Sequence, residues 1–297
     1  MIDFSSPRHR AKFGYLLLAP AVIMMALIII YPILLSVDIS LQDVRIARVG
    51  GDREPWTLEN YRWLTSSAEF WNSLWVTAKM VLTVGGISLI IGLATALLVN
   101  QKFRGRSLAR LFVALPWAVP EVVATVIWAW MLDSSFGVIN WALLKIGLVD
   151  QAIQFGSNST AAFFAVCFVM IWKGYPLVSI MLLAGLQSIP EEQYQAARVD
   201  GANVWQRFFY ITLPSLAPVL GVTSVMTTLW VFRDFAIIYV LTQGGPIGST
   251  TTLSILTFEQ SFAFFRMGQG AAVGVVTLVI CAFISRALVG RFANSVH

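Results

Sequence analysis

The chain has 297 residues, of which 58% are hydrophobic and 12% are charged, with a net charge of +5 and a mean hydropathy of +0.76. Soluble domains are closer to half apolar and about a quarter charged, so this composition excludes an ordinary soluble enzyme. It also excludes a disordered chain and a disulfide-rich secreted scaffold, and it indicates an all-α membrane protein. Cys167 and Cys281 both fall inside apolar runs, where a thiol behaves as a small hydrophobic group.

Six apolar windows are long enough to cross a bilayer core, which requires about 20 residues at helical rise. The first window could be a signal peptide, but it is long, contains Pro20 and Pro32, and has no clean small-residue cleavage site. We therefore interpret it as a retained span. The predicted spans are 14–35, 74–99, 111–132, 161–185, 215–240 and 268–289.

The distribution of basic residues predicts the orientation of these spans. The loop between spans two and three contains Lys102, Arg104, Arg106 and Arg110 and no acidic residue. Basic side chains concentrate on the cytoplasmic side, so we expect this loop and both termini to be cytoplasmic. Such a run can also bind anionic lipid or nucleotide, but topology is the favoured explanation.

Two long loops, 36–73 and 133–160, lie on the predicted outer side and contain aromatic residues suited to the headgroup region. Segment 138–149 could form a short amphipathic helix on the outer membrane surface or a face for an external partner. The sequence leaves both possibilities open.

The last large inner loop, 187–214, has the pattern of two short helices joined by a turn, and we call it the elbow. Ser188 as N-cap and Glu191 three residues later predict a capping box, with a helix that begins near Ile189. Gly201 permits a sharp turn, and Pro214 opens span five. Apolar groups exposed on such an elbow favour an interaction surface, although an elbow that packs under the membrane would carry them too.

The elbow string QAARVDGANVWQRFFYITLP resembles the signature loop of ABC-importer permease subunits, in which an E-A-A-x-x-x-G segment precedes I-x-L-P by nine residues. One position departs from that pattern, because Gln195 stands where the family has glutamate. The resemblance implies a type I ABC importer permease fold, with one transmembrane domain over 1–297 and a coupling helix that docks on an ATP-binding subunit. The implied coupling residues are Tyr194, Gln195, Ala196, Ala197, Asp200, Gly201, Ala202 and Arg207.

Further strings resemble the carbohydrate-uptake branch of that family, which serves maltose-, trehalose- and glycerol-phosphate-type systems. They include LENYRWL at 58–64, WKGYP at 172–176 and FRDFAIIYVLTQGGP at 232–246. Aligned on these landmarks, the positions that line the substrate path in the family are Trp117, Glu121, Met170, Leu177, Thr227, Val231 and Asp234.

Ionisable groups within a span are costly and usually face a pore or a partner, which adds Lys173 and Arg233 to the candidate pore residues. Pairing of Lys173 or Arg233 with Glu121 or Asp234, simply to neutralise charge, is the alternative. Spacing places Trp117 with Glu121 on one helical face, and Thr227 with Val231 and Asp234 on another. Pro116, Pro120 and Pro176 are expected to interrupt their helices.

The sequence contains no phosphate-binding G-x-x-x-x-G-K-[ST] loop, no Cys/His cluster and no visible catalytic machinery, so we expect neither an enzyme nor a metal site. The resemblance implies an inner-membrane subunit without a cofactor of its own. Its implied partners are a second permease subunit, two ATP-binding subunits that hold ATP and Mg, an external solute-binding protein and a sugar, and no nucleic acid.

Two other functions remain open at this stage. One is a stand-alone proton-coupled secondary transporter that uses Glu121 or Asp234, and the other is a structural scaffold. The substrate is also open: neutral di- or oligosaccharides are usual for the branch, while Lys173 and Arg233 leave room for an acidic or sulfonated sugar or a glycerol phosphoester.

Overall fold

The computed structural model describes residues 17–45 and 55–293, and within these ranges the chain is helical, with a single isolated bridge between Arg45 and Arg266. Several helices contain a π-helical turn, labelled η. In chain order the elements are η1 (Ala26–Ile30), α2 (Tyr31–Ser40), α3 (Glu59–Ser66), α4 (Ala68–Met80), η3 (Val81–Gly85), α5 (Gly86–Asn100), α6 (Arg106–Ala118), α7 (Glu121–Met131), α8 (Val138–Lys145), α9 (Ser159–Gln187), α10 (Glu191–Val199), α11 (Val204–Arg207), η4 (Phe208–Thr212), α12 (Leu213–Arg233), α13 (Ala236–Thr242), α14 (Leu253–Phe258), η5 (Glu259–Ala263) and α15 (Met267–Ala293).

Five continuous helical segments in the described ranges are long and apolar enough to cross a membrane, and α6 with α7 forms a sixth, sharply bent candidate. The continuous segments are Leu17–Ser40, Ala68–Asn100, Ser159–Gln187, Val204–Arg233 and Met267–Gly290. Five of the six predicted spans are therefore found in order, and the third corresponds to the bent pair of α6 and α7. The start of the first predicted window, 14–16, and the basic residues Arg8, Arg10 and Lys12 lie outside the described residues.

Two predicted details of the spans are wrong. Span five ends at Arg233 and not near 240, because Asp234 takes an extended conformation with ψ of 122° and a separate helix, α13, follows. The helix α9 also continues through Pro176, and α6 continues through Pro116, so only Pro120 stands at an actual interruption. Segment 138–149 does contain the expected short helix, α8.

The chain divides into two compact units. The first comprises 1–66 and 257–276, and within it the buried side chain of Asn60 links two helices. The Asn60 amide donates hydrogen bonds to the backbone carbonyls of Ser40 and Gln42, both at 2.9 Å. This amide thus ties α3 to the end of α2.

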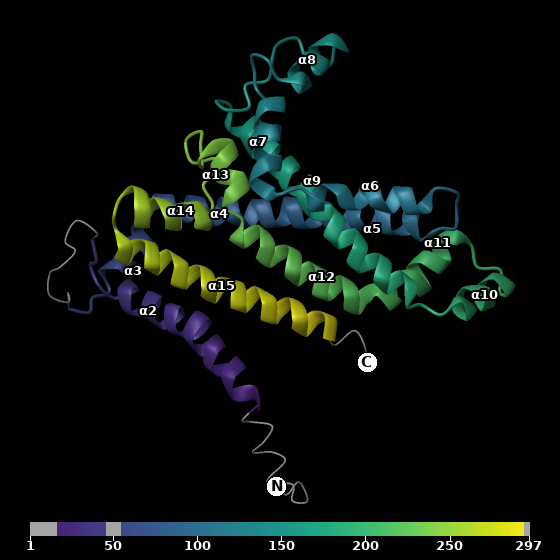
Figure 1. The fold of residues 1–297 in the computed structure, drawn as a ribbon, viewed down its shortest axis with the longest axis horizontal. Helices are drawn as coiled ribbons and strands as arrows, with labels where there is room; N and C mark the ends of the chain where they lie inside the picture. Colours follow the sequence, from purple (N-terminus) through teal and green to yellow (C-terminus); the bar gives the residue numbers. More distant parts are fainter. Residues whose placement is uncertain (1–16, 46–54, 294–297) are drawn as a thin grey trace, which may run out of the picture. The chain divides into compact units, whose positions relative to one another are not determined.

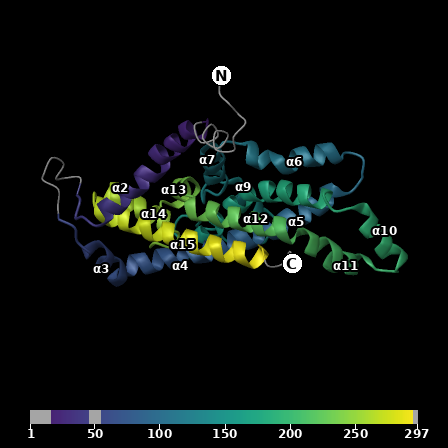
Figure 2. The same ribbon diagram turned by 90° about the horizontal axis from the view of Figure 1, so that it is seen from below.

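The second unit comprises 67–256 and 277–297 and contains every predicted pore and coupling residue. In it α5, α6 and α12 all pack against α9 (Figures 1 and 2). Small residues permit this close packing: a Cβ on Gly92 would overlap Val178, and one on Gly185 would overlap Leu216. A hydrogen bond of 2.9 Å from Thr95 to Ser179 joins α5 to α9.

Candidate functional site

Four of the predicted pore residues meet at one small cavity between α5, α9 and α12. Met170 enters from α9, Thr227 and Val231 from α12, and Asp234 from the residue that follows α12. The shared face predicted for Thr227, Val231 and Asp234 is therefore confirmed, while their contact with a solute stays a prediction. The full lining is Val84, Ser88, Met170, Gly174, Thr227, Trp230, Val231, Asp234 and Ile237.

Ser88 on α5 is a cavity residue that the sequence did not reveal. It is fully buried, and its hydroxyl has no hydrogen-bond partner among the described residues. A buried hydroxyl without a partner costs about 1–3 kcal/mol, so a polar ligand in the cavity would stabilise it. A lone serine in an apolar span gives no sequence signal, since most such hydroxyls bond to their own helix.

Asp234 is buried, at 5% exposure, and both its side chain and its backbone support the next segment. Its Oδ1 accepts a hydrogen bond of 3.2 Å from the backbone N–H of Ile237 in the first turn of α13. The hydroxyl of Ser254 donates to its backbone carbonyl at 2.7 Å. Asp234 therefore joins the end of α12 to α13 at the cavity wall.

The third predicted span is broken between Ala118 and Glu121, where α6 and α7 meet at an angle of 93°. Pro120 has no backbone N–H and disfavours helical geometry in the residue before it, and Val119 is accordingly extended, with ψ of 134°. Trp117 and Glu121 thus lie on different helices, and the prediction that they share one helical face is wrong.

Lys173 on α9 binds the open backbone carbonyls at this break. Its side chain is buried, at 5% exposure, and its ammonium donates hydrogen bonds to the carbonyls of Pro116 at 3.1 Å and Trp117 at 3.0 Å, and to that of Val119. These carbonyls belong to the end of α6, where a helix lacks internal donors and its dipole favours a cation. Glu121 opens α7, where the dipole favours a carboxylate.

The charge pairs considered as an alternative do not form. No salt bridge recorded between described residues joins Lys173 or Arg233 to Glu121 or Asp234. All three ammonium donors of Lys173 are used by carbonyls. Arg233, at the end of α12, is exposed, Trp117 is 50% exposed and Leu177 is half-buried, and none of these three lines the cavity.

The elbow contains two short helices, α10 and α11, at the end of α9 (Figure 1). Its predicted start is wrong: Ser188 ends α9, its hydroxyl donates to the carbonyl of Gly185, and α10 begins at Glu191 after Pro190. The capping box is found instead at α11. There the Asn203 side chain accepts from the Gln206 N–H, and the Gln206 side chain accepts from the Asn203 N–H.

Gly201 makes the turn of the elbow, as predicted, with a φ of +78°. The N–H of Ala202 bonds to the carbonyl of Ala197 at 2.8 Å, and the N–H of Gly201 bonds to that of Arg198 at 3.1 Å. These two bonds form a Schellman motif, which needs a left-handed residue at its centre. Glycine adopts that conformation without strain from a Cβ.

Apolar side chains cover much of the elbow surface. Val199 is 88% exposed, Trp205 71% and Tyr210 80%, and Trp205 stacks on Phe209. Of the eight predicted coupling residues, Gln195, Ala196, Asp200 and Gly201 are exposed, and Tyr194, Ala197, Ala202 and Arg207 are partly buried. Tyr194 bonds through its hydroxyl to Thr212 at 2.9 Å, which ties α10 to the base of the next span.

Within the described ranges, no group of three or more His, Cys, Asp or Glu side chains could hold a metal ion. What remains is a lined cavity between spans and an exposed apolar elbow. The uncovered apolar elbow favours a surface that docks on another protein.

Comparisons with known proteins agree with this view. Residues 88–297 match the family model described as binding-protein-dependent transport system inner membrane component. The trehalose/maltose transport system permease protein MalF of Thermococcus litoralis is 38% identical over 291 residues, which cover 96% of this chain and 95% of that protein.

Two solved structures share the fold. One is a chain in the crystal structure of a bacterial ABC transporter involved in the import of the acidic polysaccharide alginate, with a TM-score of 0.79, 23% identity and 96% of each chain covered. The other is from a bacterial alginate ABC transporter in complex with an alginate pentasaccharide-bound periplasmic protein, with a TM-score of 0.75, 25% identity and 94% and 93% of the two chains covered.

Proposed function

The chain belongs to the family of binding-protein-dependent transport system inner membrane components, and we propose that it forms half of the translocation pore of an ATP-driven sugar importer. A relative named for trehalose and maltose transport and a structural neighbour bound to a sugar-loaded periplasmic protein support the class of substrate. The same relationships make a stand-alone secondary transporter the less favoured alternative.

The observation that carries this proposal is the convergence of Met170, Thr227, Val231 and Asp234, with the unpartnered hydroxyl of Ser88, on one cavity between three spans. Its volume is about 10 Å³, which is too small for a sugar. Solute passage therefore requires the spans around it to separate, as alternating access demands.

The elbow supplies the coupling step in this proposal. Its exposed apolar side chains, Trp205 and Tyr210 among them, would dock on an ATP-binding subunit that holds ATP and Mg. Closure of two such subunits would move α10 and α11 and, through Thr212, the base of span five. A second permease subunit would supply the other half of the pore.

In this arrangement the elbow, the loop 100–105 and both termini lie in the cytoplasm of a bacterial cell, and an external solute-binding protein delivers the sugar from the other side. The basic residues of the loop support that orientation.

Uptake by proteoliposomes tests the proposal. Vesicles would contain the chain with its second permease and ATP-binding subunits, with the binding protein outside, ATP inside and radiolabelled trehalose as the probe. We expect uptake that requires ATP and the binding protein and that a protonophore leaves unchanged. Uptake without ATP that a protonophore abolishes, and that the Glu121→Gln or Asp234→Asn variant lacks, would establish the secondary transporter instead.

A further inference from the structure

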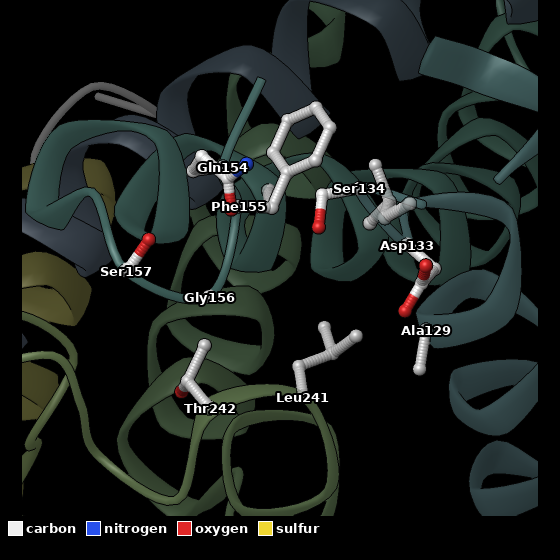
Figure 3. A pocket seen from close by; sticks show the side chains of 11 residues that line it. Ala129, Asp133, Ser134, Gln154, Phe155, Gly156, Ser157, Leu241 and Thr242 are labelled. Carbon is white, nitrogen blue, oxygen red and sulfur yellow. The ribbon is translucent and has the colours of Figure 1, made fainter. Parts of the chain in front are cut away.

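A larger hollow lies in the second unit at the other end of α9, between the ends of α7 and α13 and the loop before α9 (Figure 3). Its volume is about 380 Å³, within the range of roughly 300–1,000 Å³ usual for small-molecule sites. Since α9 has 29 residues, it places this hollow roughly 43 Å from the elbow along the helix. Ala165 of its lining lies five residues before Met170 of the inner cavity on the same helix, so the hollow lies next to that cavity on the side away from the elbow.

The walls of the hollow are fixed by hydrogen bonds beneath them. Asn140 on α8 is 2% exposed, and its amide donates to the carbonyls of Asp133 at 3.3 Å and Ile153 at 3.1 Å. Its Oδ1 accepts from the Ile153 N–H at 2.8 Å. One buried side chain therefore holds the end of α7 and the loop that faces it at a set separation, so the hollow is formed before any ligand arrives.

Several polar groups around the hollow are free to bind a ligand. The Oδ1 of Asp133 accepts from the backbone N–H groups of Ser135 and Phe136, which fixes the carboxylate and leaves Oδ2 without a partner among the described residues. The side chains of Ser134, Gln154 and Ser157 likewise make no hydrogen bond within the described ranges. Figure 3 shows Asp133 and Ser134 on one side of the hollow and Ser157 on the other.

The remaining lining is uncharged, and apart from Thr242 its side chains are apolar. The Phe155 ring stands at one edge, opposite Leu241 and Thr242 (Figure 3). Asp133 is the one acidic side chain in the lining, which contains neither lysine nor arginine. The hydroxyl groups of a sugar need hydrogen-bond donors and acceptors, and the C–H faces of its rings pack on aromatic side chains. An anionic sugar would be repelled by the carboxylate of Asp133.

We propose that this hollow is an outer subsite for one or two residues of a neutral saccharide, bound by the Asp133 carboxylate, the Gln154 amide and the Phe155 ring before the solute reaches the inner cavity. The proposal rests on the proposed function for its direction of transport. Because its lining contains an acidic and no basic side chain, the hollow favours a neutral sugar over an acidic one, a distinction that the inner cavity leaves open.

A cysteine reporter at Gly156 tests binding without relying on transport. Gly156 lines the hollow, its φ is not in the left-handed region, and a Cβ added there meets no atom within 4 Å. The Gly156→Cys chain, in native membranes, would be labelled with a charged methanethiosulfonate reagent in the presence of trehalose or of glucuronate. The unmodified chain sets the background, because its Cys167 is buried and Cys281 is half-buried.

By mass action, we expect labelling to slow about tenfold when trehalose exceeds its dissociation constant about tenfold, and glucuronate at equal concentration to leave it unchanged. Adding Asp133→Asn, which keeps the Oδ1 acceptor but removes the charge, should weaken the protection by trehalose about tenfold. Asp150→Asn, an exposed carboxylate of the same loop, should leave the protection intact. A Ser135→Cys reporter beside the hollow should remain unprotected.

The proposal is overturned if trehalose gives no protection, if glucuronate protects equally, or if Asp150→Asn acts like Asp133→Asn. A cation bound at Asp133 would appear as protection by CaCl₂ alone, and that result would also overturn it. These outcomes are separate from those of the uptake assay: failure of ATP-driven uptake with protection intact refutes the importer and leaves the subsite standing.

Discussion

The break between α6 and α7 and the elbow between α9 and α12 are both interruptions of long apolar helices, but they are completed differently. At the break, the open carbonyls of α6 bind the buried ammonium of Lys173, so the chain satisfies itself. At the elbow, Gly201 and the Asn203–Gln206 box satisfy the backbone, while Trp205 and its neighbours stay uncovered. An interruption whose open backbone groups are bonded within the chain serves to position internal residues. An interruption that leaves apolar side chains exposed indicates a surface for a partner.

The largest expected effect is that of Lys173→Met, which removes the ammonium from the break. It leaves the buried carbonyl of Pro116 and the partly buried carbonyl of Trp117 without this donor, at a cost of up to about 1–3 kcal/mol each. We expect a clear fall in the melting temperature of the purified chain in detergent. Lys145→Met is the control, because Lys145 is exposed and only lies over the Trp141 ring, at 4.6 Å. Equal melting temperatures for the two variants would show that the break does not depend on Lys173.

Trp205→Ala tests whether the exposed apolar surface of the elbow binds a partner. Because Trp205 is 71% exposed, its loss should leave the melting temperature of the isolated chain unchanged. At the centre of an interface, however, an aromatic anchor contributes about 2 kcal/mol, so the affinity for the ATP-binding subunits should fall about 30-fold. The matched control is Trp130→Ala on α7, which is 65% exposed. If both variants retain the ATP-binding subunits equally in a pull-down assay, the elbow is not the docking surface.

Gly201→Val tests whether coupling depends on the left-handed backbone conformation of the elbow turn. A left-handed conformation costs an ordinary L-residue about 1–2 kcal/mol and is worst for a β-branched one, whereas asparagine tolerates it. We expect Gly201→Val to lower sugar-dependent ATPase activity severalfold and Gly201→Asn to preserve most of it. Equal activities would mean that the φ of +78° at this position is not required for coupling.

Gln195→Glu should have the smallest effect. The side chain is exposed on α10, and an exposed ion pair contributes at most about 1 kcal/mol. Restoring the carboxylate should therefore raise the affinity for the ATP-binding subunits by no more than about fivefold, as titration calorimetry would measure. A lower affinity would show that the amide itself is used at this position.

The six spans could be predicted because apolar length is a local property of the sequence. The turn at Gly201 was equally accessible, since only glycine suits a Schellman centre so readily. Ser188 was misassigned because a serine can end one helix as readily as it begins the next, and the actual capping box lay at Asn203. Local rules could not choose between the two positions.

The partners of Lys173 were beyond sequence reasoning for a different reason. Its ammonium meets carbonyls more than fifty residues away, at a break whose angle depends on tertiary packing. A lysine in a span suggested either a pore or an acidic partner. Backbone carbonyls could not be predicted as its partners, because every residue has one and the sequence does not mark those that lack a donor. Ser88 was missed because its hydroxyl stands out only through the lack of a hydrogen-bond partner among the described residues, which a sequence does not show.

Hydrogen–deuterium exchange tests the comparison most directly. It would be measured on the chain alone in detergent and on the importer assembled with its ATP-binding subunits. Exchange reports local opening of the backbone. We therefore expect the elbow segment 188–214 to exchange slowly only in the assembly, and the segment 115–125 around the break to be protected equally in both samples. Protection of the elbow in the isolated chain, or protection of the break only in the assembly, would contradict this expectation.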